Sequence, residues 1–179
     1  MRLVLVSPLY PPDVAWPAPY VKELAKRLAK EHIVTIVTYG HLPEQVPDVK
    51  IIAIDKRRPL ILRLIAYVVA LWRATRNADL VYAQNGPSVE LPLAIVNFFL
   101  QRPLVMQWGD TPAHEYAQKH FSRRAIERAA FAHAKVITDA PSAKPEILPL
   151  EPRPDAALAE WERSWNTHLQ SLKKEFQNV

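Results

Sequence analysis

The side chains available in this sequence exclude several kinds of chemistry. No cysteine is present, which rules out disulfides, thiolate metal sites and cysteine nucleophiles. The six histidines show no zinc-ligand spacing, and neither a Gly-x-Gly-x-x-Gly nor a Walker loop occurs in a chain with only three glycines. We therefore expect no bound metal and no tightly bound cofactor.

Basic residues are concentrated around one apolar segment, residues 59–72. The chain has a formal net charge of +5, and six of its cations are Lys56, Arg57, Arg58, Arg63, Arg73 and Arg76. The segment is shorter than the roughly 20 residues that a membrane span needs. Two interpretations stay open: a buried helix that covers a sheet beside solvated cations, or a surface helix that touches anionic lipid through its flanking arginines. The cations are not interleaved with aromatic residues as in nucleic-acid-binding modules, so we expect no nucleic-acid partner.

Six short apolar runs alternate with helical patterns along the first 140 residues. The runs are rich in valine, isoleucine and leucine, and lie at 3–6, 33–37, 51–54, 80–82, 104–106 and 136–138. Such runs are typical of parallel strands buried on both faces. Helical periodicity covers 21–28, 59–77, 88–100 and much of 112–133. The pattern predicts an α/β fold: a single Rossmann-like domain whose parallel sheet has helices on both faces and binds ligands at the carboxyl ends of its strands.

The composition changes after residue 140. Five prolines between 141 and 154 predict an extended linker, because proline fits neither a helix interior nor a central strand. Residues 155–179 form an amphipathic helix whose apolar stripe contains Leu158, Trp161, Trp165, Leu169, Leu172 and Phe176. We expect this helix to dock back on the domain of residues 1–140. The alternative is a homodimer formed through the two tryptophans.

The first residues do not read as a secretion signal. Their apolar run is five residues long and ends at Ser7 and Pro8, which is typical of a buried strand. Together with the absence of cysteine, this favours a cytoplasmic protein. Peripheral contact of the apolar helix with lipid would place the protein at the inner membrane surface.

A series of short motifs runs in order through residues 1–140. They are the strand and Tyr-Pro-Pro loop of residues 5–12, Tyr20 with the helix from Leu24 to Leu28, the His-x-Val-Thr-x-Val-Thr pattern of 32–38, Ala-Asp-Leu-Val-Tyr at 78–82, Arg-Pro-Leu-Val at 102–105, and Ala-Lys-Val-Ile-Thr at 134–138. In their order and spacing these motifs resemble the N-terminal domain of family 4 glycosyltransferases, which have the two-domain GT-B fold.

The resemblance implies a division of labour between two domains. This domain would bind a carbohydrate or lipid-linked acceptor, and a separate donor-binding domain would hold the nucleotide sugar, for retaining hexosyl transfer in the cleft between them. The resemblance places acceptor-binding residues in the loops that follow the strands. These residues are Pro12, Asp13, Trp16, Tyr20, Gln84, Asn85, Trp108, Gly109 and His114.

The sequence departs from the family pattern at two of these loops. Family members carry a Gly-Gly pair after Tyr-Pro-Pro, whereas this chain has Trp16 and Pro17. The usual backbone contact to an anion is therefore compromised, because Trp16 is bulky and Pro17 has no amide hydrogen. Trp16 could instead stack on a sugar ring. After the strand at 104–106 the family has a histidine where this chain has Trp108; Asp110, as a catalytic group, and His114 are the nearby candidates to substitute for it.

The family's donor domain, with its Glu-x7-Glu motif, has no counterpart in this chain. Glu23 and Glu31 have that spacing by coincidence, because they flank a helix of the acceptor-side domain. The last helix resembles the crossover helix that closes many GT-B enzymes. Three interpretations follow: an acceptor-binding component of a glycosyltransferase, a non-catalytic scaffold protein derived from one, or a truncated piece of a longer enzyme.

Overall fold

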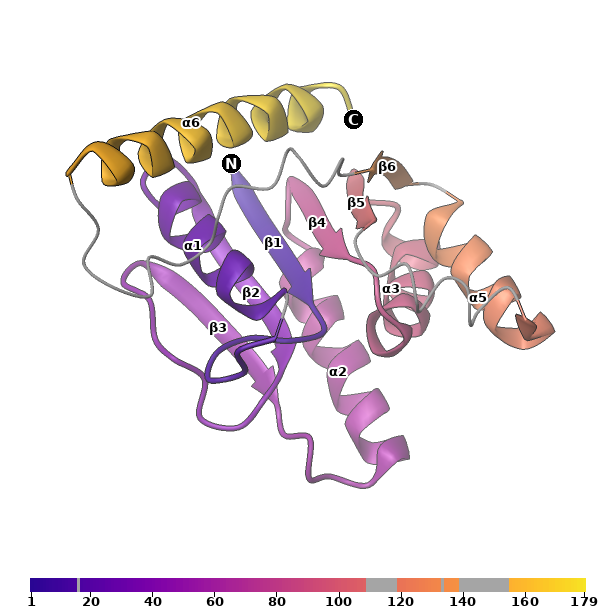
Figure 1. The fold of residues 1–179 in the computed structure, drawn as a ribbon. Helices are drawn as coiled ribbons and strands as arrows, with labels where there is room; N and C mark the ends of the chain where they lie inside the picture. The colour runs from indigo at the N-terminus through magenta and orange to yellow at the C-terminus, as the bar shows by residue number, and fades with distance from the viewer. Residues whose placement is uncertain (16, 109–118, 133, 139–154) are drawn as a thin grey trace.

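A six-stranded parallel sheet forms the centre of the molecule (Figure 1). The structure is a computed structural model that describes residues 1–179 except 16, 109–118, 133 and 139–154. The strand order is β3-β2-β1-β4-β5-β6. The strands are β1 (Arg2–Ser7), β2 (Ile33–Tyr39), β3 (Val49–Ile54), β4 (Leu80–Gln84), β5 (Leu104–Trp108) and β6 (Ala134–Thr138). Each contains the apolar run that predicted it, which confirms the Rossmann-like α/β fold.

Five helices in the described part of the chain cover the sheet. They are α1 (Ala18–Leu28), α2 (Leu60–Thr75), α3 (Pro87–Leu100), α5 (Phe121–Phe131) and α6 (Asp155–Gln177). Figure 1 shows α1 in front of the sheet and α2 and α3 behind it, and α5 packs against α3. None of these helices is both long and apolar enough to cross a bilayer.

Two buried clusters fill the space on either side of the sheet. Leu3, Leu5 and Tyr82 point into the cluster under α1 and α6, whereas Val4 and Val81 point into the cluster under α2 and α3. This alternation follows from the two-residue period of a strand. Both faces of the central strands are therefore buried, as their continuous apolar sequences predicted.

The C-terminal helix docks on the face that α1 covers, as expected from its apolar stripe. Figure 1 shows α6 crossing near the amino-terminal ends of the strands. The Trp165 ring stacks on Tyr20 of α1 with 5.7 Å between ring centroids. At the other end of α6, Phe176 packs edge-on against Tyr82 and Glu175 pairs with Lys135 at 2.6 Å. The helix thus connects α1 to the far strands of the sheet.

Helix α2 is less buried than a sheet-covering helix was expected to be. Only Tyr67, Leu71 and Thr75 are buried in it. Tyr67 stacks on Tyr39 of β2 and its hydroxyl donates to the carbonyl of Val37. The helix therefore packs on the sheet along one side while much of its apolar surface is exposed. Its amino-acid composition could not show this, because both sides are apolar.

Candidate functional site

The order of the strands places a switch point at the carboxyl edge of the sheet, where doubly wound sheets usually have their ligand-binding crevice. The chain moves outward from β1 in one direction through β2 and β3, and in the other through β4, β5 and β6. Connections on the two sides of such a reversal leave in opposite directions, which opens the usual ligand-binding position of a doubly wound sheet. Ser7 ends β1 and Gln84 ends β4, so these residues flank the crevice. Gly86 helps to keep it narrow, because a Cβ there would lie 3.3 Å from the Pro8 side chain.

A row of polar side chains crosses this edge beneath α1. Each member ends an apolar stretch of its strand and lies two residues after a side chain of the cluster under α1, so it faces the same side of the sheet. In the strand registers Thr38 lies beside Ser7, and Gln84 lies beside Gln107. Val6 lies beside Ala83, one residue before Ser7 and Gln84 in their strands, so the two pairs belong to one row. The polar row consists of Thr38, Ser7, Gln84 and Gln107, all at most 3% exposed.

Two hydrogen bonds meet at the Gln107 side chain, whereas the Ser7 and Thr38 hydroxyls donate to the backbone carbonyls of Leu9 and Tyr39. The Oε1 atom of Gln107 accepts from the Tyr82 hydroxyl and from Nε2 of Gln84, the latter at 3.2 Å. The Oε1 atom of Gln84 is buried and receives no hydrogen bond from the part of the chain that the structure describes. An unsatisfied buried carbonyl typically costs about 1–3 kcal/mol. A hydroxyl or amide hydrogen placed beside this oxygen would remove that cost.

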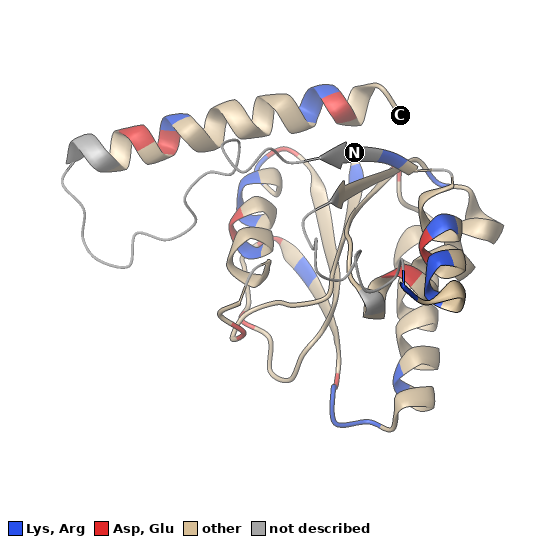
Figure 2. Ribbon diagram, turned by 45° about the vertical axis from the view of Figure 1, so that its right-hand side comes forward, with Lys and Arg blue, Asp and Glu red and all other residues tan. Residues whose placement is uncertain are grey.

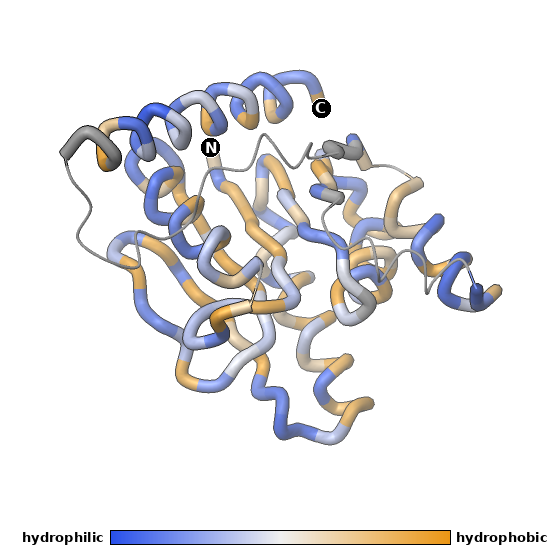
Figure 3. The backbone as a smooth tube through the Cα atoms, in the orientation of Figure 1, coloured by the Kyte–Doolittle hydropathy of each residue, from blue (hydrophilic) through white to orange (hydrophobic). Residues whose placement is uncertain are grey.

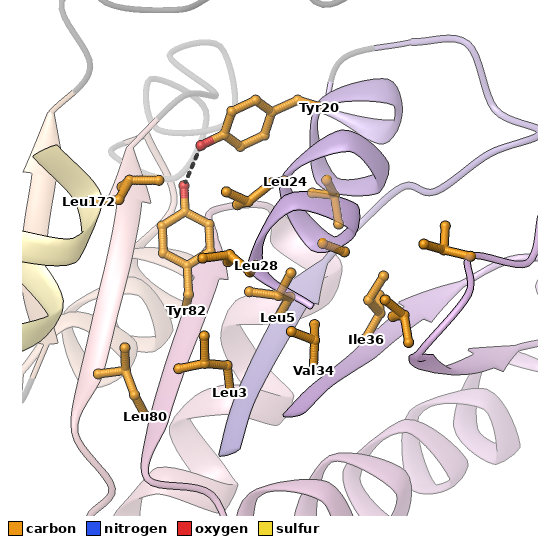
Figure 4. Packing of buried hydrophobic residues seen from close by; sticks show 14 of the residues in the cluster. Leu3, Leu5, Tyr20, Leu24, Leu28, Val34, Ile36, Leu80, Tyr82 and Leu172 are labelled. Carbon is orange, nitrogen blue, oxygen red and sulfur yellow. Dashed lines mark hydrogen bonds between the residues drawn. The ribbon is translucent and has the colours of Figure 1, made fainter. Parts of the chain in front are cut away.

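Tyr20 lies beside Tyr82 (Figure 4), whose hydroxyl donates to Gln107 of the polar row. Its hydroxyl lies 3.2 Å from the Tyr82 hydroxyl and 2.7 Å from Nε2 of His168. The side chain is fully buried between the sheet and α6. The sequence placed Tyr20 among the acceptor-binding residues; the structure places it in the packing that holds α6.

The loop after β1 borders a first cavity, of about 220 Å³. Pro12 and Asp13, both predicted to contact the acceptor, line it together with Lys22 and Glu44. Asp13 pairs with Lys56 at 2.7 Å, and Lys22 pairs with Glu44. Most polar groups of this small cavity thus already have partners within the protein.

A larger cavity, of about 500 Å³, opens between α2, α3 and α5 at the carboxyl end of β2. Its apolar walls are Leu60, Leu64, Leu91, Pro92 and Ile126, and its polar lining is Tyr39, Arg63, Ser88, Glu90, Ser122 and Arg123. The Tyr39 hydroxyl donates to the Ser88 carbonyl at 3.0 Å, and burial raises its pKa to about 12, so it stays protonated. Two guanidinium groups beside apolar walls suit an amphiphile better than a plain sugar.

The structure brings some of the predicted site residues together, and others lie outside the residues that it describes. Gln84 and Asn85 lie at the crevice, where the backbone N–H of Asn85 donates to the backbone carbonyl of Gln107 at 3.1 Å. Trp108 ends β5, and only its backbone is described. Trp16, Gly109, Asp110 and His114 lie outside the described residues.

Several residues of the site were not singled out from the sequence. They are Ser7, Thr38, Gln107 and Arg123. The first three had a readable signal, since each is a polar residue that follows a buried apolar run at a predicted strand end. Arg123 had none, because its place in the same cavity as Arg63 depends on how α5 packs against α3.

The comparisons with known proteins agree with the family resemblance. The sequence profile described as "Glycosyl transferase 4-like domain" matches residues 17–141. No curated protein sequence matches the chain. Among solved structures, HepE from Anabaena in complex with UDP and glucose aligns with a TM-score of 0.45 and 16% identity, over 80% of this chain and 48% of that one.

A second solved structure, a UDP-N-acetylglucosamine 2-epimerase, aligns with a TM-score of 0.49 and 16% identity, over 78% of this chain and 41% of that one. The chain thus spans less than half the length of either protein. The profile match covers most of the chain, including four of the five described helices and the last five strands of the sheet. The chain therefore belongs to the glycosyl transferase 4-like domain family.

Proposed function

We propose that this chain is the acceptor-binding half of a glycosyltransferase, and that a separate donor-binding domain supplies the nucleotide sugar. The family match supports a role in sugar transfer. The observation that carries the acceptor assignment is the open Oε1 atom of Gln84 in the polar row. A sugar hydroxyl donates to an amide oxygen, and the neighbouring amides and hydroxyls can accept or donate in turn.

The helix termini at the crevice support a separate donor domain. A nucleotide diphosphate is usually held by the free amides of a helix N-terminus. Pro17 occupies the N-cap position of α1 and Pro19 the second position of that helix, and α3 begins at Pro87. Proline has no amide hydrogen, so both helices beside the crevice lack part of the usual anion contact. The edge suits neutral hydroxyl groups better than a diphosphate.

The larger cavity favours a lipid-linked acceptor over a free sugar. It lies on the α2 and α3 side of the sheet, opposite the side that the polar row faces, and Ser88 and Glu90 from the first turn of α3 line it. The Arg63 and Arg123 guanidinium groups could bind a phosphate, and the leucine side chains could contact an acyl or isoprenoid chain. On this proposal the sugar hydroxyl lies at the polar row and the apolar part of the acceptor in the cavity.

The test is a titration of the isotope-labelled chain with two kinds of probe, followed by NMR of the glutamine side-chain amides. A panel of p-nitrophenyl hexopyranosides stands for the acceptor and UDP-glucose for the donor. We expect at least one hexoside to shift the Gln84 and Gln107 signals, and UDP-glucose to leave them unchanged. Gln84→Leu should weaken hexoside binding about tenfold, as expected for loss of a hydrogen bond worth about 1.4 kcal/mol.

The exposed residue Gln45 provides the matched control. Gln45→Leu should bind the hexosides as the unchanged chain does, and Gln84→Met serves as a second variant if Gln84→Leu does not fold. Sugar transfer from UDP-glucose is expected only when a donor-binding domain is added in trans. Transfer by the chain alone would contradict the need for a second domain. If no hexoside shifts Gln84, the acceptor assignment is wrong and the scaffold interpretation is preferred.

A further inference from the structure

The outer side of α2 and the C-terminal half of α3 form one exposed apolar surface. Of the sixteen large hydrophobic side chains exposed in the described residues, nine lie on these two helices. The α2–α3 apolar surface consists of Leu60, Ile61, Leu62, Ile65, Val69, Trp72, Ile95, Phe98 and Phe99. Single exposed apolar residues are ordinary, but a contiguous set of this kind marks an interaction site.

The geometry of the helices makes this surface continuous. Leu62, Ile65, Val69 and Trp72 follow spacings of three and four, so they lie along one side of α2. The Trp72 ring meets the Phe99 ring edge-on with 6.0 Å between centroids, which joins the two helices. Phe98 and Phe99 are also in edge-on contact, and their side chains are 73% and 65% exposed. Figure 3 shows the strongly apolar character of both helices.

Cations lie at both ends of the apolar surface. Lys56, Arg57 and Arg58 precede α2, and Arg73 and Arg76 lie at its C-terminal end; Figure 2 shows the basic loop before α2 as a blue segment. Between residues 55 and 102 the sequence has seven basic and three acidic residues. This stretch thus carries most of the chain's net positive charge.

Several of these cations are available to an external partner. Arg57 pairs with Asp55 and Lys56 with Asp13. No carboxylate of the described residues pairs with the Arg58, Arg73 or Arg76 side chain, and all three residues are exposed. The other two acidic residues of the stretch do not neutralise them, because Asp79 accepts from the Arg2 amide and Glu90 is buried.

We propose that the α2–α3 apolar surface docks on a bilayer that contains anionic phospholipids. An apolar strip flanked by unpaired cations is the composition of a helix that lies in the membrane interface, with its apolar side chains in the acyl boundary and its cations at the phosphates. A second copy of the chain fits less well, since it would bring the same cations face to face. Only Leu60 of this surface also lines the larger cavity, so binding at the other eight residues can be tested separately from the proposed acceptor site.

Vesicle sedimentation of the purified 179-residue chain tests the proposal. The vesicles are phosphatidylcholine alone, or phosphatidylcholine with about one third phosphatidylglycerol. We expect the chain to sediment with the anionic vesicles, and its partition to fall about tenfold on neutral vesicles or when salt rises from about 0.1 to about 0.5 M. Equal binding to both vesicles, or no binding to either, would overturn the proposal.

Two sets of substitutions separate the apolar and the cationic contributions. Ile65→Ser, Phe98→Ser and Phe99→Ser combined, or Arg58→Gln, Arg73→Gln and Arg76→Gln combined, should each reduce partition at least about tenfold. All six positions are exposed, so the variants should fold.

The matched controls remove exposed residues elsewhere. The apolar control combines Leu42→Ser and Leu158→Ser, and the cationic control combines Lys30→Gln, Lys50→Gln and Lys174→Gln, at positions that are all exposed. Both should bind like the unchanged chain; a loss as large as in the test variants would contradict a localised surface. Sedimentation equilibrium tests whether a second copy of the chain occupies the surface instead. A dimer that the serine substitutions abolish, together with no binding to vesicles, would assign the surface to a second copy.

Discussion

Two buried tyrosines differ in what their hydroxyl groups contact. The Tyr20 hydroxyl is hydrogen-bonded to His168 and lies beside Tyr82. The Tyr10 hydroxyl is equally buried but has no hydrogen-bond partner among the described residues, and burial together with Glu44 raises its pKa to about 12. Removal of a hydrogen-bonded hydroxyl leaves its buried partner atom without that bond, whereas removal of a hydroxyl that has no partner leaves no other atom unsatisfied.

Tyr20→Phe should therefore destabilise the protein and Tyr10→Phe should not. We expect Tyr20→Phe to lower the free energy of unfolding by about 1–3 kcal/mol, and Tyr10→Phe to change it by less than about 0.5 kcal/mol or to raise it. Urea unfolding of both variants beside the unchanged chain measures the difference. Equal costs for the two would show that the His168 contact does not stabilise the docked helix.

The ion pair between α1 and α6 should make stability depend on pH. The Arg27 guanidinium contacts both carboxylate oxygens of Glu162 at 2.7 and 2.8 Å, and this contact lowers the pKa of Glu162 from its usual value of 4.5. A carboxyl whose pKa is lower in the folded state stabilises the protein above its unfolded pKa, and this contribution is lost as pH falls through the folded pKa.

Glu162→Gln should accordingly cost stability at pH 7 and nothing at acid pH. The Glu162 side chain is 46% exposed, so solvent screening limits the expected cost to about 0.5–1 kcal/mol. Urea midpoints of the variant and the unchanged chain should differ at neutral pH and converge below the Glu162 pKa. A difference that persists in acid would indicate lost packing rather than a lost ion pair.

At the scale of elements, α6 completes the covering of the sheet. The α1 side of the sheet has only two helices in the described residues, whereas α2, α3 and α5 cover the other side. Without α6, Tyr20, Tyr82 and neighbouring leucines would lose their cover. Trp165 is the centre of the contact, since its ring is fully buried, stacks on Tyr20 and lies 5.0 Å below the Arg27 guanidinium carbon.

Truncation of Trp165 should therefore have the largest effect of any single change in α6. Trp165→Ala should cost about 3–5 kcal/mol, the usual range for a large aromatic residue removed from a core. Leu158→Ala on the same helix, at a 43% exposed position, should cost less than about 0.5 kcal/mol. Thermal unfolding of the two variants gives the comparison, and a small effect of Trp165→Ala would mean that α6 contributes little to the fold.

At the scale of the whole molecule, two surfaces are available for binding. The crevice and the polar row lie at the carboxyl edge of the sheet, and the α2–α3 apolar surface lies along the outer side of two helices. Leu60 belongs to that apolar surface and also lines the larger cavity. If both proposals hold, a bilayer on the apolar surface would lie next to the cavity proposed for a lipid-linked acceptor.

Much of the fold could be read from the sequence because it is encoded locally. The apolar runs give the strands and the three-and-four spacing gives the helices, and both followed the expected order. The site was only partly readable. Gln84 and Asn85 could be placed, since the carboxyl edge follows from the alternation of strands and helices, whereas the role of Tyr20 depended on which helix would cover it.

The sequence by itself determined the alternation of strands and helices, the family, and the docking tendency of the last helix, since each follows from periodicity or motif order along the chain. The tertiary structure decided which side of each element is covered. Tyr20 is buried because α6 lies over it, and α2 kept an exposed apolar side because one face of it was enough to cover the sheet. Periodicity identifies an apolar side, but only the neighbouring elements determine whether anything packs against it.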